Sequence, residues 1–88
     1  MRIDKYLKIS RVIKRRTEAK CACEHNCVKI NDKLAKAGNN IKIFDKIEIR
    51  FRHKILEIEV LKIPEGNVSV SSASQFYRII KEEKINFD

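Results

Sequence analysis

The sequence contains very little glycine and proline, with 2 Gly and 1 Pro among 88 residues. Disordered low-complexity chains and fibrous repeats are rich in one or both of these residues, so the composition argues against both classes. Hydrophobic residues make up 43% of the chain, which is enough to form a packed core. We therefore expect one small folded domain, of a size that suits a binding module better than an elaborate catalytic cleft.

Long hydrophobic runs are also missing. Charged residues interrupt the chain every few positions, and no stretch approaches the roughly 20 apolar residues that a membrane-spanning helix needs. No apolar run of the signal-peptide type is present near the start of the chain. The sequence therefore predicts a cytoplasmic protein that does not contact a membrane.

The motifs of common enzyme classes are missing as well. The chain has no glycine-rich phosphate loop and no visible pairing of a nucleophile with a base. Because His53 has no such partner in the sequence, we interpret it as a loop residue. The sequence thus predicts no catalytic residue and no cofactor.

The three cysteines raise the question of a metal site. Cys21, Cys23 and Cys27 enclose His25, but this spacing matches no usual zinc pattern and no second ligand pair follows. An odd number of cysteines in a chain expected to lie in the cytoplasm indicates reduced thiols. We therefore predict no metal ligand, and interpret the cysteines as small packing residues near a helix end.

Positive charge is what the chain has in excess. Lys and Arg total 20 against 12 Asp and Glu, which gives a net charge of +8. The first 20 residues hold eight of these cations and only two acids, Asp4 and Glu18. A basic block can simply be a solvated helix face, but its concentration at one end of a basic domain favours nucleic acid as the partner.

Hydrophobic spacing predicts two short helices at the front of the chain. Residues 2–9 place their apolar side chains on one side and mostly basic side chains on the other, as in an amphipathic helix. A second apolar stripe predicts a helix from about residue 15 to residue 25. Asn26 follows it, and Asn readily adopts the left-handed conformation with which helices often end.

The rest of the chain predicts a small sheet and one more helix. Residues 28–30 and 33–37 form a hairpin around Asn31-Asp32, and two alternating segments, 47–51 and 56–60, form an antiparallel pair with one buried face. Residues 72–75 have the form of a capping box, which predicts a helix over 73–84.

The fold class expected from this order is α+β. Two short N-terminal helices pack on a small, mostly antiparallel, twisted sheet, and a C-terminal helix follows. We expect residues 1–62 to form the nucleic-acid-binding domain, and residues 63–88 to form a loop and a C-terminal helix docked on the same domain.

Three short motifs in this order resemble a known RNA-binding domain. The chain is similar to the αL, or S4-like, domain, which is named after the fourth protein of the small ribosomal subunit. The residues that carry the resemblance are Arg2, Ile3 and Asp4, then Arg16, Ala19 and Lys20, and finally Val28, Ile30 and Asn31.

The whole chain further resembles the bacterial RqcP (YabO) family of ribosome-associated quality control. The segments that select this family are "SRVIKRRTEAK" and "YRIIKEEK". The chain departs from the family at two turns, where Asn31-Asp32 replaces Asn-Gly and residues 43–45 replace Pro-Gly-Asp. It also carries Arg15 where many relatives of the domain have a Ser or Thr helix cap.

The resemblance implies where RNA binds. Basic side chains of the two helices and the hairpin would line one concave surface, and the start of the second helix would offer N–H groups to a phosphate. Asp4 would orient Arg2, Arg11 or Arg16 rather than contact RNA. The residues expected to bind RNA are Arg2, Lys5, Lys8, Arg11, Lys14, Arg15, Arg16, Lys20, Lys33 and Lys36.

The resemblance also implies partners. They are the large ribosomal subunit with its ribosomal RNA, the peptidyl-tRNA that obstructs it, and an alanine-adding factor of the RqcH type that tails the stalled chain, with this protein acting as a monomer. Alternatives are a heat-shock-type S4-like protein that recycles free large subunits, or a general ribosomal RNA binder with a role in assembly. A DNA-binding regulator is a weaker alternative, because a hairpin follows the two helices and no dimer stripe is visible.

Overall fold

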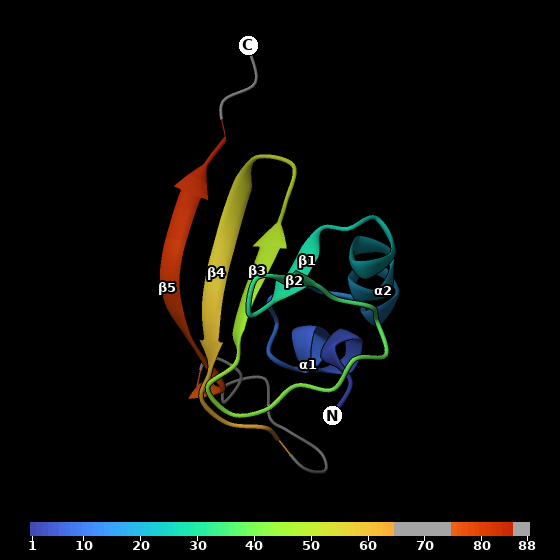
Figure 1. The fold of residues 1–88 in the computed structure, drawn as a ribbon, viewed down its shortest axis with the longest axis vertical. Coiled ribbons are helices and arrows are strands. Elements are labelled where there is room, and N and C mark those ends of the chain that lie inside the picture. The colour runs from blue at the N-terminus through green and yellow to red at the C-terminus, as the bar shows by residue number, and fades with distance from the viewer. Residues whose placement is uncertain (65–74, 86–88) are drawn as a thin grey trace.

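The computed structural model of the protein describes residues 1–64 and 75–85. Two short helices precede a five-stranded sheet, in which the strand order is β2-β1-β3-β4-β5 and each neighbouring pair is antiparallel. Both helices lie beside the part of the sheet formed by β1, β2 and β3. The start of β4 and the end of β5 extend past the helices (Figure 1). The elements are α1 (Ile3–Ile9), α2 (Arg16–Glu24), β1 (Val28–Ile30), β2 (Lys33–Leu34), β3 (Lys46–Arg50), β4 (Lys54–Val60) and β5 (Tyr77–Lys84).

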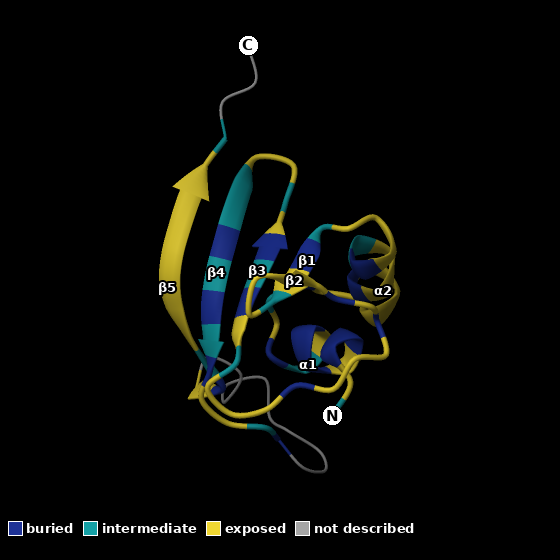
Figure 2. Cartoon of the chain, in the orientation of Figure 1, coloured by how far each residue is buried: buried dark blue, intermediate teal, exposed yellow. Residues whose placement is uncertain are grey.

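The core forms between the helices and the inner face of the sheet. In β3 and β4 the buried residues alternate with more exposed ones, as expected for strands with one buried face. Figure 2 shows this burial concentrated in α1, β1, β3 and β4, whereas β5 is almost entirely exposed. The largest fully buried side chains include Ile3, Tyr6 and Leu7 of α1, which pack with Ile47 and Ile58 of the sheet. No helix in the described part of the chain is long and apolar enough to cross a membrane.

Most of the elements predicted from the sequence are confirmed, including their turns. Asn26 has a φ of 60° directly after α2, which is the left-handed conformation expected there. Asn31 and Asp32 have φ values of 50° and 68°, as a two-residue hairpin turn with two left-handed positions requires. The amide of Asn31 also donates a hydrogen bond to Asp45 at 3.1 Å, which joins this turn to the residue before β3.

The predicted C-terminal helix is wrong over residues 77–84, which form strand β5. The first part of that prediction, up to residue 74, lies outside the described residues. Ile79 pairs with Ile58 and Lys81 pairs with Glu57, so Ile80 is an extra residue in a β-bulge. A bulge interrupts the two-residue alternation of a strand, and here it places apolar residues at a spacing that imitates a helix.

A buried hydrogen bond fastens the start of this last strand to the first helix. The hydroxyl of Tyr6 donates to the carbonyl oxygen of Phe76 at 2.6 Å, and the backbone N–H groups of Leu61 and Lys62 donate to the same oxygen at 2.8 and 3.1 Å. Burial raises the pKa of Tyr6 above its usual range, so the hydroxyl keeps its proton and remains a donor. The segment around Phe76 is therefore part of the same folded unit as α1.

Candidate RNA-binding site

Asp4 is a buried carboxylate between two arginines. It is only 2% exposed, and its Oδ2 atom lies 3.3 Å from Nη2 of Arg2 and 3.5 Å from Nε of Arg16. Its other oxygen accepts a hydrogen bond from the backbone N–H of Lys5 at 2.8 Å. The side chains of Arg2 and Arg16 remain 50% and 48% exposed. Each guanidinium is thus held on one side by Asp4 and offers its other side to solvent.

The loop after β2 positions the first of these arginines. The backbone N–H groups of Ile3 and Asp4 donate to the carbonyl oxygens of Asn39 and Ala37, at 2.8 and 3.4 Å. Arg2 itself forms an isolated bridge with Asn40. This loop supplies acceptors to the first turn of α1, where Arg2 makes no side-chain cap.

Sequence reasoning missed this pairing of residues 37–40 with the start of α1. The composition of that segment indicates a turn, but no hydrophobic period reveals which part of the chain a turn contacts. The position of Gly38 is also informative, because a Cβ atom there would meet the Arg2 guanidinium at 3.8 Å. The Arg2 side chain therefore lies over the backbone of this loop.

The start of α2 has the open end that the sequence predicted. Arg15 occupies the N-cap position in an extended conformation, with φ of −124° and ψ of 139°, and its side chain makes no cap hydrogen bond. The N–H groups of the first turn are favourable positions for an anion. That a phosphate binds there remains a prediction.

The other predicted RNA-binding residues are exposed, and they lie on α1, α2 and β2 or in the segments directly next to them. No ion pair involves any of them within the ranges 1–64 and 75–85, so their charges are not neutralised by neighbouring carboxylates there. Arg11 has a φ of 66° in the turn after α1 and, unlike Arg2 and Arg16, does not pair with Asp4. These residues are Lys5, Lys8, Arg11, Lys14, Arg15, Lys20, Lys33 and Lys36.

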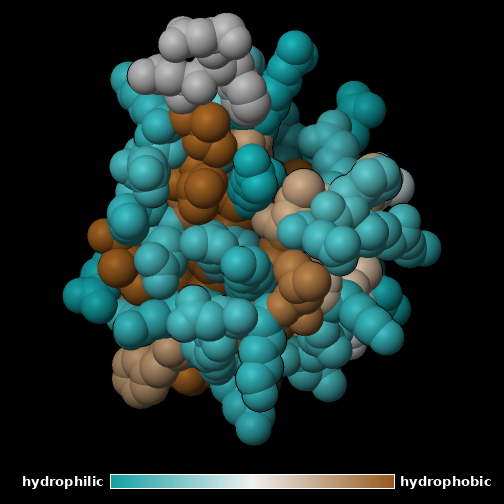
Figure 3. All heavy atoms as spheres, turned by 45° about the horizontal axis from the view of Figure 1, so that its top comes forward, coloured by the Kyte–Doolittle hydropathy of each residue, from teal (hydrophilic) through white to brown (hydrophobic). Residues whose placement is uncertain are grey.

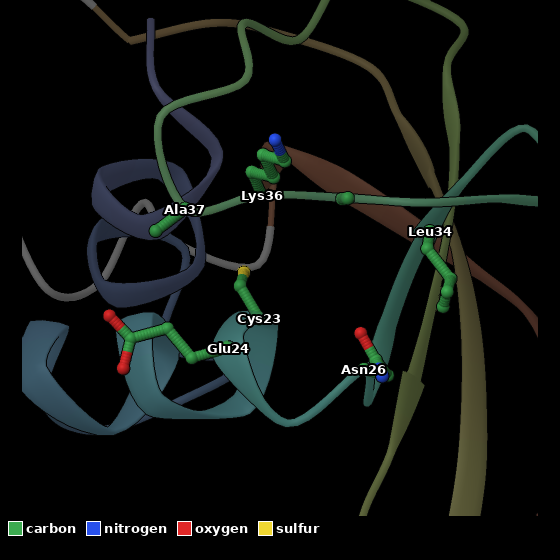
Figure 4. Close-up of a pocket in the computed structure, with 7 residues that line it drawn as sticks. Cys23, Glu24, Asn26, Leu34, Lys36 and Ala37 are labelled. Carbon is green, nitrogen blue, oxygen red and sulfur yellow. The ribbon is translucent and has the colours of Figure 1, made fainter.

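An open groove separates the end of α2 from the hairpin. Cys23, Glu24 and Asn26 line one side, and residues 34–37 line the other. Figure 4 shows Cys23 pointing from α2 toward the segment at Ala37, while Glu24 points away. Lys36 therefore lies near the C-terminal end of α2, whereas Arg16 is the first residue of that helix, so basic residues occur near both of its ends.

The cysteines differ strongly in their surroundings. Cys23 is buried, Cys27 is half-buried and Cys21 is exposed, and all three are free thiols. Burial, with a smaller contribution from the nearby charges of Asp4 and Glu24, raises the pKa of Cys23 to about 11. Packing is thus confirmed for Cys23 but not for Cys21, whose sulfur lies 3.6 Å from Nδ1 of His25. Across residues 1–64 and 75–85, no group of three or more His, Cys, Asp or Glu side chains is placed to hold a metal ion.

We expect Cys23 to react with iodoacetamide at pH 8 about a hundredfold more slowly than Cys21, because only the thiolate reacts and its fraction falls tenfold for each unit of pKa. Peptide mass spectrometry of a labelling time course would measure both rates. In guanidinium chloride the two rates should converge. Equal rates in the folded protein would show that Cys23 is accessible and would contradict its burial against Ala19 and Val28 in the core.

Comparison with known proteins gives consistent results. A model of the S4 domain family matches residues 1–47. A Streptococcus pneumoniae protein named RQC P-site tRNA stabilizing factor is 42% identical, over 97% of this chain and 96% of its own. A Halalkalibacterium halodurans protein of the same name is 44% identical, over 98% and 97%. The trimeric Heat Shock Protein 15 of Vibrio cholerae superposes with a TM-score of 0.82 at 30% identity, covering 90% of this chain and 80% of that one.

Proposed function

The chain belongs to the S4 domain family, among the RQC P-site tRNA stabilizing factors, and on that premise we propose that it binds large ribosomal subunits obstructed by peptidyl-tRNA. It contacts ribosomal RNA and the tRNA in ribosome-associated quality control. The observation that supports this most directly is the pair of half-exposed arginines held by one buried carboxylate. Arginine suits this task because its planar group can bind phosphate oxygens through two hydrogen bonds.

The protein acts by binding and not by catalysis. It holds the tRNA in position while a factor of the RqcH type adds alanine residues to the stalled chain, so its contribution is a shift in populations of bound states. It works as a monomer in the cytoplasm, associated with ribosomes. The phosphates lie along the cations of α1, the start of α2 and the hairpin, from Lys5 to Lys36.

The direct test is sedimentation of cell lysate through a sucrose gradient at moderate salt. We expect the wild-type protein to travel with free large subunits and an Arg16→Ala variant to remain at the top. Arg78→Ala is the matched control, because Arg78 lies on β5 and pairs with Glu59 at 2.6 Å. If the wild type does not associate with subunits, the proposed partner is wrong. If Arg16→Ala sediments with the subunits as the wild type does, the proposed partner is still supported, but Arg16 does not contribute to binding it.

The second candidate is the recycling role of heat-shock-type relatives, which the fold similarity to Heat Shock Protein 15 favours. Members of that group usually carry a basic C-terminal segment, whereas residues 65–88 of this chain hold three cations and four acids. Deletion of the gene separates the two functions. Loss of alanine tails from stalled chains supports the first function, and normal tails with accumulated free subunits support the second.

A further inference from the structure

The turn that joins the loop after β2 to β3 contains an exposed aromatic residue with an unusual backbone conformation. Phe44 is 70% exposed, the highest value among the large hydrophobic residues that the described ranges expose. Its φ is 74°, a left-handed conformation that side chains other than glycine rarely adopt. Strained positions of this kind persist where the surroundings enforce them, and they concentrate at functional sites.

Hydrogen bonds on both sides hold this turn rigidly. The backbone N–H of Asp45 donates to the carbonyl oxygen of Lys42 at 3.1 Å, and the Asp45 carboxylate accepts from the N–H of Lys42 at 2.8 Å. The N–H of Phe44 donates to the carbonyl oxygen of Val60 at 2.7 Å, and the N–H of Val60 donates to that of Asp45 at 2.9 Å. The ring of Phe44 is therefore presented from a fixed backbone.

The surroundings of the ring combine apolar surface with positive charge. Phe44 and Asp45 both hydrogen-bond to Val60, so the regular pairing of β3 with β4 ends at this turn, and the residue after Val60, Leu61, is exposed like Phe44. Lys42 and Lys62 flank these two residues and are exposed. The nearby acid, Asp45, already uses both carboxylate oxygens in hydrogen bonds to Lys42 and Asn31. An exposed ring among cations is the arrangement that binds single-stranded nucleic acid, with bases stacked on the ring and phosphates near the charges.

The turn is continuous with the arginine cluster at Asp4. The same loop contacts Arg2 at Gly38 and Asn40, and Figure 1 shows it passing beneath α1 before it reaches β3. Phe44 is four positions after Asn40 in the sequence, so their Cα atoms are at most about 14 Å apart. One RNA strand can therefore reach from the arginines to the ring within a few nucleotides.

We propose that Phe44 stacks on an unpaired base of the RNA whose phosphates are bound by Arg2 and Arg16. This inference rests on the proposed RNA-binding function and adds to it a contact that recognises a base and not a phosphate. Figure 3 shows that other apolar side chains reach the surface elsewhere, in a band on the face turned forward there. Ile79 and Ile80 of β5 are exposed but belong to a strand edge and are not aromatic. Phe44 differs from them because its ring is held in a strained and braced turn.

The sequence contains no tryptophan, which permits a direct optical test. In a Phe44→Trp variant the single indole reports on its own surroundings. We expect single-stranded oligoadenylate to quench its fluorescence by roughly half or more and to shield it from acrylamide, because bases stack on aromatic rings. An abasic oligomer of equal length carries the same phosphates and should leave the fluorescence nearly unchanged.

The matched control places the indole at the other end of β3, as Phe51→Trp. Phe51 is half-buried after Arg50 and lies under the ammonium group of Lys54, 5.4 Å from the ring centroid. Oligoadenylate should not quench this variant. Equal quenching at both positions, or an equal response of Phe44→Trp to the abasic oligomer, would overturn the stacking proposal.

Two further variants separate binding from folding. Phe44→Gly removes the ring and relieves the left-handed backbone, so it should raise Tm by about 4 to 8 °C while lowering affinity for oligoadenylate about tenfold. Phe44→Leu keeps an apolar side chain without the ring and should lose a similar affinity. The salt dependence of binding should not change, since no cation is removed.

These results distinguish failure of the inference from failure of the proposed function. If Phe44→Gly binds oligoadenylate as tightly as the wild type while Arg16→Ala binds it weakly, stacking is refuted and RNA binding stands. If the wild type binds neither oligomer at low salt, both the proposed function and the inference that rests on it are contradicted.

Discussion

Replacing Asp4 with Asn is expected to weaken RNA binding about tenfold, although the change makes the protein more positive, because freed guanidinium groups must be ordered again on binding. A simple count of charges predicts the opposite sign, since removal of an acid should strengthen attraction to phosphates. The structure favours the loss, because Asp4 holds both Arg2 and Arg16 through one oxygen. Fluorescence anisotropy with a ribosomal RNA fragment at fixed salt would measure the effect.

The same substitution should lower the free energy of unfolding by about 1 to 3 kcal/mol, because hydrogen bonds to a charged group are lost inside the protein. Chemical denaturation measures this loss in the free energy of unfolding separately from RNA binding. The matched control is Glu18→Gln, which makes the same change in charge at an exposed acid of α2 that has no ion pair within the described ranges. It should bind RNA as well as the wild type or slightly better. Unchanged or improved affinity in Asp4→Asn would refute the orienting role.

Removal of both arginines is expected to have the largest effect on binding. Six to eight phosphate contacts give a slope of log affinity against log salt of about −4 to −7. The double variant Arg2→Ala with Arg16→Ala should lose about 1.4 to 1.8 of this slope, because two phosphate contacts disappear. At physiological salt we expect affinity to fall roughly a hundredfold, about tenfold for each charge-assisted contact. A salt titration of the anisotropy curve gives both quantities.

The control for this pair is Arg78→Ala combined with Lys81→Ala on β5. It removes the same total charge from a strand that lies at the edge of the sheet, away from α1 and α2 (Figure 1). We expect a change in slope well below that of the helix pair, because charge that does not touch the RNA acts only through the screened field. If the two double variants lose equal slope, the protein is attracted by its net charge and has no localised arginine site.

The front of the chain could be predicted from its sequence because its signals are local. The spacing of Ile3 and Leu7 indicates a helix on its own, and Asn31-Asp32 marks a turn through its residue types. The sequence predicted that Asp4 pairs with arginines. It did not decide between Arg2, Arg11 and Arg16, because the actual partners depend on how α1 packs against α2. That packing brings together residues from two elements, which no periodic pattern records.

The end of the chain could not be predicted in the same way. The β-bulge at Ile80 gives residues 76–80 a spacing that fits a helix, and only pairing with β4 decides for the strand. Ion pairs between β4 and β5, such as Lys54 with Glu82 at 3.1 Å, join residues 28 positions apart, so neither segment's sequence alone indicates them. The exposure of Phe44 was likewise invisible, because an aromatic residue in a sequence is most often interpreted as part of the core.

The hydrogen bond between Tyr6 and Phe76 links residues 70 positions apart, and this separation affects how the protein is made. Contacts between residues so far apart in the sequence form late in folding, because a long loop of chain must close before the two residues can meet. During synthesis the first helix emerges early, but its hydroxyl has no acceptor until residue 76 follows. The arginine surface at the front of the chain thus reaches its final stability only after residue 76 has been synthesised.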